Sequence, residues 1–449
     1  MDSDSLVRGI RHSAAAFALG TLAALLTGCS TDKPSEPTPT NQLPAGIHAL
    51  AGIASNLPDT DLDPFRQLIG STQVVALGES THMSQGYYQA KARLIHYMVE
   101  ELGFRIITFE TPWLAALPAT RYVESCSGTP EASMRGFHRV WHDVTVRNLL
   151  FWLCDYNRSH PNDKVKFYGM DIQEPWNSAP ALEAFLQKAA PTEAARAAPM
   201  RRCLGGSARN DSFFVSQDYL DLVAGRRNVA AHDECIQGIA GLESWISANH
   251  ATLAAATSAA DVEEARLSLV SMRAMEDQLW IPDPGGYQGR DRGMAELTRR
   301  LRDLHARDKK MIVWAWNWHI ARRYEEVKGF DEDPERIVPR QGARAMGGFL
   351  SDAYGSNYLP IALIGYQVAM PFGTQPPLQT NPLSVEHRLH QLGEPYLLVD
   401  LRAPLPDTLM VPGRTYRISQ EWGDPYRQFG GLLFLDNSAA MTMIPIPAQ

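Results

Sequence analysis

Seven short apolar segments recur along the chain, and they constrain its fold more than any other feature of the sequence. They are rich in β-branched and aromatic residues and are bounded by glycine, proline or charge, as buried strands are. We expect strands at 73–79, 104–110, 165–171, 310–319, 358–365, 396–401 and 431–436. Between the first two, SQGYYQAKARLIHYMVEELGF has the pattern of a helix that Gly103 closes. Strand, helix, strand at this spacing predicts an α/β fold with a mostly parallel central sheet flanked by helices.

The segment 178–305 has a different character. It is rich in alanine, arginine, leucine and glutamate, has helical periodicity and carries few strand signals. We interpret it as a mainly helical lobe inserted between two strands of the sheet. Residues 46–449 are then expected to form one α/β domain that contains this lobe.

The N-terminal 45 residues are expected to lie outside this domain. Arg8 and Arg11 precede an apolar stretch, SAAAFALGTLAALL, that is too short to span a bilayer comfortably. The stretch ends in LTGC, which resembles the lipobox of bacterial lipoproteins, where the cysteine is acylated and becomes the mature N-terminus. We therefore expect residues 1–28 to be a lipoprotein signal peptide and Cys29 to carry the lipid. An ordinary secretory signal and a chance apolar segment are the alternatives.

Residues 29–45 follow as an extended tether of prolines and small polar residues. The residue directly after Cys29 is Ser30 and not aspartate, which among bacterial lipoproteins favours sorting to the outer membrane. The expected location is the cell envelope, with the protein held at the outer membrane or facing the periplasm. Beyond the tether no stretch reaches about eighteen consecutive apolar residues, which excludes a membrane-spanning body.

Charge and cysteine content restrict the partners and the covalent links. The formal net charge is −8 and no run of lysine or arginine is dense, so nucleic acid is not an expected partner. The four cysteines after Cys29 allow three pairings, and an oxidising compartment permits them to form. Short loops favour Cys126–Cys154 and Cys203–Cys235. Their spacing does not match a zinc knuckle.

Polar side chains stand at the expected carboxyl ends of four successive strands. They are Glu79 and His82, then Glu110, then Asp171, and last Asn317 and His319. Each alone has an ordinary explanation, because a carboxylate there is commonly a helix cap and a single histidine is commonly satisfied locally. A parallel sheet, however, brings all such ends to one edge, where ligands bind in open α/β sheets. We therefore expect these residues to share an active site.

The segment GESTHMSQGYYQAKARLIHYMVEELGFRIITFE resembles the opening motif of the erythromycin esterase family. That motif is a Gly-Glu-x-x-His turn, a helix with a basic residue, then Gly-Phe and a strand ending in glutamate. The likeness continues, in order, in LLFWLCDYNRSHPNDKVKFYGMDIQ, GRDRGMAE, WAWNWHIAR and MGGFLSDAYGSNY. It covers most of the chain from about residue 70 onward.

The resemblance implies a hydrolase that cleaves a lactone or other ester, as family members cleave macrolide antibiotics and so confer resistance. It implies no covalent intermediate, no metal and no cofactor, and its partner would be a small-molecule ester. At matching positions His82 is implied as the general base, with Glu79 and Glu110 orienting it. His319 is implied as the second histidine of a His-Asn-x-His element, and Lys91 stands where some members carry arginine.

Two positions depart from the family pattern. Trp316 replaces the first histidine of the His-Asn-x-His element, and Leu297 stands where an asparagine is common. An indole at position 316 would fill space and remove a polar group from the edge of the site. These departures bear on macrolide cleavage more than on the fold.

The residue types also support water activation independently of the resemblance. Histidine has an ordinary pKa of about 6.5, so it can accept and release a proton near neutral pH. A neighbouring carboxylate fixes its tautomer and favours the imidazolium that forms when it acts as a base. Lys91 or Arg290 is expected to supply positive charge for the developing oxyanion, and Asp171 and Trp316 to contribute to the substrate site.

Other mechanisms and roles stay open. A serine nucleophile is disfavoured because no G-x-S-x-G elbow is present. A metal-dependent hydrolase would use Glu79, His82, Glu110 and His319 as ligands. A non-catalytic ligand-binding lipoprotein is the further alternative, and Trp316 motivates it.

Overall fold

The computed structural model describes residues 42–173, 177–206, 229–280, 288–305, 309–328, 343–371, 379–419 and 421–447. The chain divides into two units, and the second, Leu43–Gln449, contains every helix and strand named below. The expected signal peptide, Cys29 and nearly all of the expected tether lie outside the described residues. Within the part that is described, no helix is long and apolar enough to cross a membrane.

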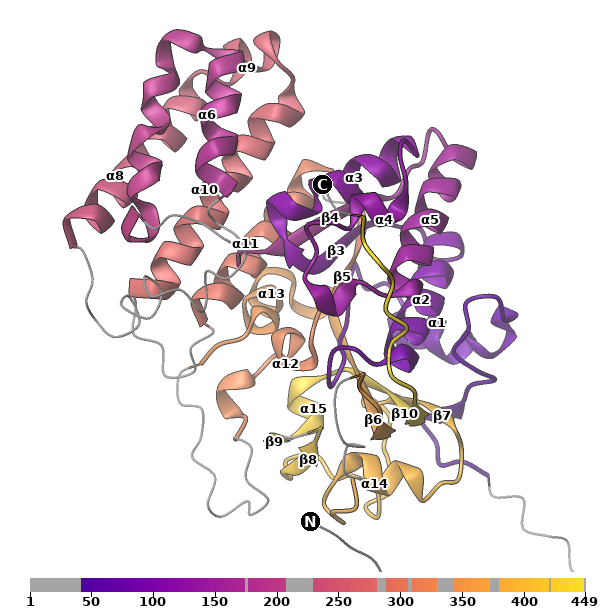
Figure 1. Cartoon of the computed structure of the whole chain (residues 1–449). Coiled ribbons are helices and arrows are strands. Elements are labelled where there is room, and N and C mark those ends of the chain that lie inside the picture. The colour runs from indigo at the N-terminus through magenta and orange to yellow at the C-terminus, as the bar shows by residue number, and fades with distance from the viewer. Residues whose placement is uncertain are drawn as a thin grey trace, which may run out of the picture. The chain divides into compact units, whose positions relative to one another are not determined.

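Eight strands of the described chain form one central sheet (Figure 1). In spatial order they are β1 (Ile47–Ala49), β7 (Tyr396–Asp400), β10 (Gly431–Ser438), β6 (Tyr358–Val368), β2 (Val74–Leu77), β5 (Lys310–Trp314), β3 (Phe104–Pro112) and β4 (Lys166–Asp171). From β10 to β4 the neighbours are parallel, whereas β7 pairs antiparallel with both β10 and β1. The prediction of a mostly parallel sheet is confirmed; the short edge strand β1 was not expected.

The predicted strand 310–319 is wrong beyond its first half. Strand β5 ends at Trp314, and Asn317–Ile320 forms the short helix α12. The Asn317 side chain donates to the carbonyl of Leu363 at 2.9 Å and accepts from its N–H at 3.1 Å, which ties this turn to β6. The apolar residues after Trp314 are therefore buried in a helical turn, and periodicity alone does not separate that from a buried strand.

The sheet is covered by apolar residues on both faces, because successive side chains of a strand point in opposite directions. Val75 and Leu77 of β2 pack in the layer that includes α1 (Asp63–Ile69), α2 (Gln85–Glu100) and α5 (Val144–Ser159). Val74 and Ala76 face the opposite layer. A strand buried on both faces is a continuous apolar run, which explains why VVAL was recognisable in the sequence.

The predicted helix between the first two strands is α2, and it positions the residues that precede it. It ends at Glu100, and Gly103 follows with a φ of +72°, a left-handed conformation that glycine adopts without steric cost. The chain then enters β3 directly. This compact strand–helix–strand unit fixes the turn between β2 and α2 at the carboxyl edge of the sheet.

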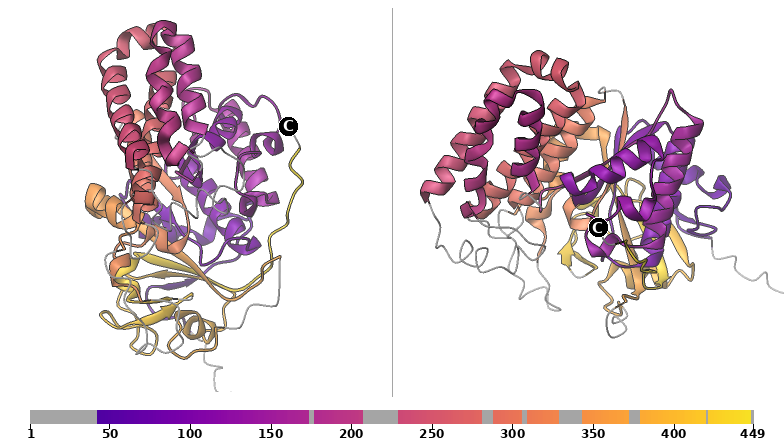
Figure 2. Two further views of the ribbon diagram at one scale, coloured as in Figure 1. Left: turned by 60° about the vertical axis from the view of Figure 1, so that its left-hand side comes forward. Right: turned by 45° about the horizontal axis from the view of Figure 1, so that its top comes forward.

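The described part of 178–305 is helical and lies between β4 and β5 in the chain. Its elements are α6 (Ser178–Ala189), the 3₁₀ segment η4 (Pro191–Gly206), α8 (Val229–Ala248), α9 (His250–Ala256), α10 (Ala259–Trp280) and α11 (Gln288–Leu304). Figures 1 and 2 show α6, α8, α9 and α10 gathered on the side of the sheet away from α2 and α5. Helix α11 returns toward the sheet and packs on α10 and on α13 (Met346–Tyr354).

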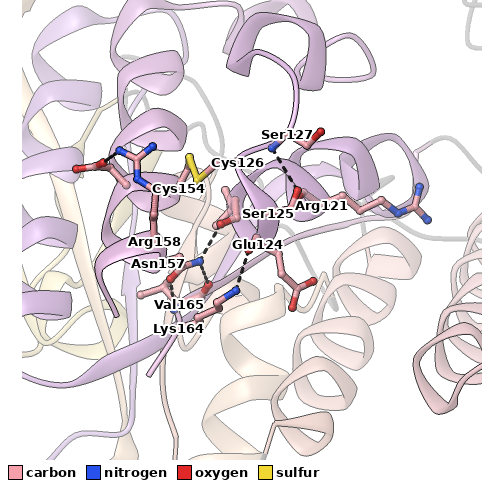
Figure 3. The surroundings of a disulfide bond; sticks show 12 residues. Arg121, Glu124, Ser125, Cys126, Ser127, Cys154, Asn157, Arg158, Lys164 and Val165 are labelled. Carbon is pink, nitrogen blue, oxygen red and sulfur yellow. Dashed lines mark hydrogen bonds and ion pairs between the residues drawn. A yellow bond between two sulfur atoms is a disulfide. The ribbon is translucent and has the colours of Figure 1, made fainter. Parts of the chain in front are cut away.

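Two disulfides form with the predicted pairing. Cys203–Cys235 joins η4 to α8, and Cys126–Cys154 joins the end of α3 (Trp113–Ser125) to α5. Beside the second bond, the Asn157 amide donates to the carbonyls of Val123 and Val165 at 2.9 and 2.8 Å (Figure 3). The start of β4 is thereby fixed to the helices that flank it.

The remaining helices, strands and 3₁₀ turns of the described chain lie in the connections between the strands of the central sheet. They are α4 (Pro130–Ser133), α14 (Val385–His390), α15 (Pro425–Gln428), the antiparallel pair β8 (Tyr416–Ile418) and β9 (Glu421–Gly423), and the 3₁₀ turns η1 (Asp59–Asp61), η2 (Arg139–Trp141), η6 (Tyr324–Glu326) and η7 (Gly355–Asn357). Of these, η2 carries Trp141, whose indole reaches the carbonyl of Glu110 in β3.

Candidate active site

The carboxyl ends of β2, β5, β3 and β4 lie side by side, because these strands are consecutive in the sheet. They carry the polar residues expected from the sequence: Glu79 and His82 after β2, Trp316, Asn317 and His319 after β5, Glu110 within β3, and Asp171 at the end of β4. The structure thus brings the predicted residues to one edge of the sheet. Two hydrogen-bonded clusters form there.

The first cluster, called the His82 cluster, consists of Glu79, His82 and Lys91. Glu79 is fully buried, and its Oε1 lies 2.8 Å from Nδ1 of His82. Its Oε2 accepts a hydrogen bond from Nζ of Lys91, which also donates to the carbonyl of Ala315 at 3.1 Å. The carboxylate therefore orients the imidazole and is itself held by a buried cation.

Lys91 is placed deeper than the sequence suggested. Its side chain is fully buried, and Nζ lies 4.5 Å from the centre of the Trp314 ring. Burial lowers the pKa of Lys91, and the nearby carboxylates of Glu79 and Glu110 oppose that shift. Lys91 is thus held against Glu79 inside the protein, and its expected role in charge stabilisation stays a prediction.

His82 stands on a tight turn whose shape depends on distant parts of the chain. The next residue, Met83, has a φ of +68°, which is costly for a side chain with a Cβ. Its N–H donates to the Tyr88 hydroxyl, and its carbonyl accepts from the N–H of Met441, both at 2.8 Å. These two bonds hold the turn in that conformation.

The imidazole of His82 has one ring nitrogen engaged and one available. Its side chain is 33% exposed, and its ring meets the edge of Trp141 at 4.9 Å between centroids. Since Nδ1 is bound to Glu79, Nε2 is the nitrogen that can accept a proton. Nε2 makes no hydrogen bond within the described part of the chain.

The second cluster, called the Arg290 cluster, consists of Glu110, Asp171, Arg290, Asp291 and His319. Arg290 comes from α11 and donates to both carboxylate oxygens of Asp171, through Nε at 3.1 Å and Nη2 at 2.7 Å. Nη2 also donates to Glu110 Oε1 at 2.9 Å, and Nη1 lies 3.0 Å from Nε2 of His319. One guanidinium thereby connects β3, β4, α11 and α12.

Charge in this cluster outweighs burial. Burial alone would raise the pKa of Asp171, but the guanidinium of Arg290 and His138 bring it well below its usual range. Burial would likewise raise the pKa of Glu110, whereas His319, His82 and Arg290 lower it overall. Burial opposes the charge of Arg290, yet its carboxylate neighbours, Asp171 first, raise its pKa further. The two carboxylates are therefore ionised and the arginine is charged.

His319, expected in the active site from the sequence, has partners at both ring nitrogens. Its Nδ1 lies 2.8 Å from Oδ1 of Asp291, and that oxygen also accepts the N–H of Met346 at 2.7 Å. Burial alone would lower the pKa of His319, but Asp291 and Glu110 raise it. In the neutral ring Nε2 accepts from Arg290, and in the charged ring Nε2 faces Glu110 at 3.4 Å. Both ring nitrogens are engaged in either state, so this residue positions the cluster.

Trp316 links the two clusters. Its backbone N–H donates to Glu110 Oε2 at 2.8 Å, and its indole N–H donates to the carbonyl of Ser80 at 3.1 Å. The ring meets His319 edge-on at 5.7 Å between centroids. The indole does fill space, as expected, and its N–H is used inside the protein. Leu297, the other departure, is fully buried on α11.

Three residues of the site were not singled out from the sequence. Asp291 fixes His319, Trp141 donates through its indole to the Glu110 carbonyl at 2.6 Å, and His138 has Nε2 at 3.8 Å from Asp171 Oδ2. Asp291 lies in the GRDRGMAE segment, between Arg290 and Arg292. Alternating charges of this kind are also common on the solvent-exposed face of a helix, so the sequence did not single out Asp291. FHRVWHD, with His138 and Trp141, shows no local signal, because its role depends on the fold.

The alternatives of a metal or a serine nucleophile gain no support from the geometry. No group of three or more His, Cys, Asp or Glu residues is arranged to hold a metal ion in the parts of the chain that are described. Lys91 and Arg290 already occupy the carboxylate oxygens of Glu79 and Glu110. The hydroxyl of Ser80 pairs with the Tyr87 phenol at 2.6 Å and with no imidazole in the described structure.

A hollow of about 520 Å³ also opens on the lobe, between α8, α10, α11 and α13. It is lined by Arg292 and Gly293 of α11, whereas Arg290 and Asp291 of the same helix face the sheet edge. It contains none of the side chains of the two clusters. This hollow and the two clusters are therefore separate features of the described structure.

The family model for erythromycin esterase matches residues 99–438, which is most of the chain. The protein belongs to the erythromycin esterase family. That membership suggests a hydrolase. The match includes the whole Arg290 cluster and begins after Glu79, His82 and Lys91.

Individual relatives are distant. An Escherichia coli erythromycin esterase type II is 29% identical over 120 residues, which cover 26% of this chain and 28% of that protein. A putative hydrolase of Bacillus subtilis, YbfO, is 24% identical over 291 residues, 62% of each chain. The chain thus matches less than two thirds of the length of either curated relative.

Solved structures share the fold over almost the whole chain. A Bacillus cereus protein superposes with a TM-score of 0.70 at 19% identity, covering 89% of this chain and 97% of that one. An erythromycin esterase mutant in an open conformation superposes with a TM-score of 0.65 at 18% identity, covering 89% and 99%. At such identities the likeness establishes the α/β fold alone.

Proposed function

We propose that the protein hydrolyses an ester, either a lactone or another bulky hydrophobic ester, with His82 as the general base that activates water. The observation that supports this most is the Glu79–His82 pair. Its carboxylate is buried and fixed, its imidazole is one-third exposed, and one ring nitrogen is available. In such a pair the carboxylate fixes the orientation of the imidazole, and the partly exposed imidazole can act as a base on water at the edge of the sheet.

In the proposed reaction Nε2 of His82 takes a proton from water while the water oxygen adds to the ester carbonyl carbon. The carbonyl oxygen becomes an oxyanion, and the imidazolium that forms is stabilised by Glu79. Collapse of this intermediate breaks the bond to the alcohol oxygen, which leaves with a proton, and releases the acid. General-base assistance of this kind contributes about 100- to 10,000-fold in rate.

Arg290 is the cation best suited to the oxyanion. A guanidinium has five N–H groups. Two from Nη2 and one from Nε go to the carboxylates of Asp171 and Glu110, and one from Nη1 reaches His319. Within the described contacts, one N–H of Nη1 is left to meet developing negative charge.

The test is hydrolysis of a panel of macrolides, simpler lactones and activated esters by the purified protein. We expect at least one class to be cleaved, and His82→Asn to lose about 100-fold or more of kcat. His48→Asn is the matched control, because His48 lies on β1 at the opposite end of the sheet order from β4. Equal turnover by the His82 variant and the parent would remove His82 from the mechanism.

A non-catalytic ligand-binding role is the second candidate, and Trp316 is the observation that favours it. Here the indole occupies the position of a family histidine, and its N–H is bound to Ser80. If the parent binds lactones without cleaving them and Trp316→His gains hydrolysis, this second candidate is correct. If the parent cleaves them, it is excluded.

We also propose that Cys29 carries lipid and holds the protein in the cell envelope. The support is the LTGC sequence after an apolar segment and the proline-rich tether that follows. Stable anchoring takes two or more acyl chains, since each buried methylene contributes about 0.8 kcal/mol and one chain binds only marginally. The parent should fractionate with membranes, whereas Cys29→Ala should become soluble or stay unprocessed. A mature-sized Cys29→Ala protein in the membrane fraction would contradict the proposal.

A further inference from the structure

Ester cleavage must return a proton to the alcohol oxygen as it leaves. Apart from His82, which takes a proton from water in the proposed reaction, the cationic and imidazole groups of the two clusters are Lys91, His319 and Arg290. Lys91 is fully buried beneath Glu79, and His319 has both ring nitrogens engaged. Arg290 holds its protons permanently, because a guanidinium does not titrate in proteins. None of these three is suited to give up a proton to a substrate.

His138 has the properties that these residues lack. It lies just before η2, and its side chain is 39% exposed. Its Nε2 is covered by protein, lies 3.8 Å from Oδ2 of Asp171 and has no hydrogen-bond partner in the described structure, so Nδ1 is the nitrogen open to a substrate. Asp171 is fixed by two hydrogen bonds from Arg290, so the carboxylate beside this imidazole is ordered.

The two accessible histidines approach β3 from opposite sides. His82 comes from the β2 side and meets Trp141, whose indole is bonded to the Glu110 carbonyl of β3. His138 stands beside Asp171 of β4, which borders β3 on the side away from β5 and β2. The backbone carbonyl of His138 accepts the backbone N–H of Trp141 at 2.9 Å, so the turn that carries His138 also carries the indole that contacts His82.

We propose that His138 is the general acid that protonates the leaving alcohol, and this rests on the proposed ester hydrolysis at His82. As the bond between the carbonyl carbon and the alcohol oxygen breaks, the electron pair goes to that oxygen. The oxygen takes the proton of the His138 imidazolium, and the neutral ring is reprotonated from solvent. His82 releases to solvent the proton it took from water, so the net reaction is ester plus water to acid plus alcohol. After β5 the indole of Trp316 lies at the edge of the site, and His138 supplies an imidazole beside Asp171 of β4.

The experiment compares two esters of the same acid with His138→Gln. A p-nitrophenyl ester has a leaving group that needs no proton, whereas an alkyl ester has one that does. We expect kcat for the alkyl ester to fall by about 100-fold or more and kcat for the aryl ester to change by less than about threefold. Glutamine keeps the size and polarity of the side chain, and thermal unfolding of the variant checks that the fold is intact. His138→Asn is the second variant, and it should show the same split.

His142→Gln is the matched control, since His142 lies in the same loop and also has an unpartnered Nε2 in the described structure. It should leave both rates unchanged. Equal losses on the two esters, or no loss on either, would overturn the role of His138. If the parent cleaves neither ester nor any lactone, the proposed function itself is wrong and the assignment of His138 falls with it. If the parent cleaves both and only the split is missing, the proposed function stands and the inference alone is rejected.

Discussion

The His82 cluster and the Arg290 cluster both place a histidine beside a carboxylate and a cation, but the two histidines differ in exposure and in the number of their partners. His82 pairs with a carboxylate three residues earlier, keeps one ring nitrogen available and is one-third exposed. His319 is buried, and its partners Asp291, Arg290 and Glu110 come from two other elements of the fold. The two histidines, each beside a carboxylate, thus differ in whether the second ring nitrogen has a partner in the described structure. Substitutions in the two clusters separate these cases.

The largest effect on stability is expected from Arg290→Met. The substitution would leave Asp171 and Glu110 buried without their cation, and breaking a buried ion pair from one side costs about 3–5 kcal/mol. Urea unfolding at neutral pH measures the change. Arg292→Met on the same helix is the control, because Arg292 is exposed and its loss should cost less than about 0.5 kcal/mol. Similar losses for the two variants would show that the Arg290 cluster does not stabilise the fold.

Acidification should remove the stabilisation that the ionised Asp171 carboxylate contributes to the Arg290 cluster, and because its pKa is lowered this carboxylate should be protonated after surface carboxylates of ordinary pKa. Although burial opposes it, Arg290 lowers the pKa of Asp171 below the ordinary value of 3.8. The folded state therefore binds fewer protons there than the unfolded state, so the contribution is complete above that ordinary value. It is lost as the pH falls through the lower, folded-state pKa.

The measurement is the free energy of unfolding of the parent and of Asp171→Asn from about pH 6 to about pH 3. Asparagine cannot titrate, so the variant is expected to be less stable throughout and to lose less on acidification. Parallel curves for the two proteins would contradict the shifted pKa of Asp171.

His319→Asn and His82→Asn test the comparison directly. Asparagine is too short to reach both Asp291 and Arg290, and an unsatisfied buried partner costs about 1–3 kcal/mol. The same change at His82 leaves Glu79 bound to Lys91, so stability should change by less than about 1 kcal/mol. Unfolding and kcat are measured on both variants. If His82→Asn were the more destabilising, the assignment of a free and a structural histidine would be reversed.

A smaller effect than those at Arg290 and His319 is expected from the hydrogen bond of Trp141, which connects His82 to β3. Trp141→Phe keeps an aromatic ring against His82 and removes the indole donor to the Glu110 carbonyl, a loss of about 1 kcal/mol. Trp113→Phe is the control, because the buried indole N–H of Trp113 has no partner in the described structure and no hydrogen bond is lost. Both rings are buried and both substitutions remove volume from the core, so both variants should be destabilised, and Trp141→Phe should lose about 1 kcal/mol more of the free energy of unfolding than Trp113→Phe.

Much of the fold could be predicted because its signals are local. Strands buried on both faces are continuous apolar runs, and the helix before β3 carries its own closing glycine. The predicted strand at 310–319 failed in its second half for the same reason, since a buried helical turn at Asn317–Ile320 is as apolar as a strand. The disulfide pairing followed from short loops, and the structure confirms both bonds.

The sequence by itself determined that Glu79, His82, Glu110, Asp171 and His319 reach one edge of the sheet, because parallel strands bring their carboxyl ends to one side and these polar residues lie at those ends. It also placed Glu79 next to His82, a contact that spans one turn. Only the tertiary structure decided what each residue does there. Arg290 and Glu110 are 180 residues apart, and Asp291 meets His319 through a helix that returns from the lobe. Whether an imidazole nitrogen has a hydrogen-bond partner depends on donors and acceptors that are distant in the chain, and the residues next to the histidine in the sequence do not reveal them.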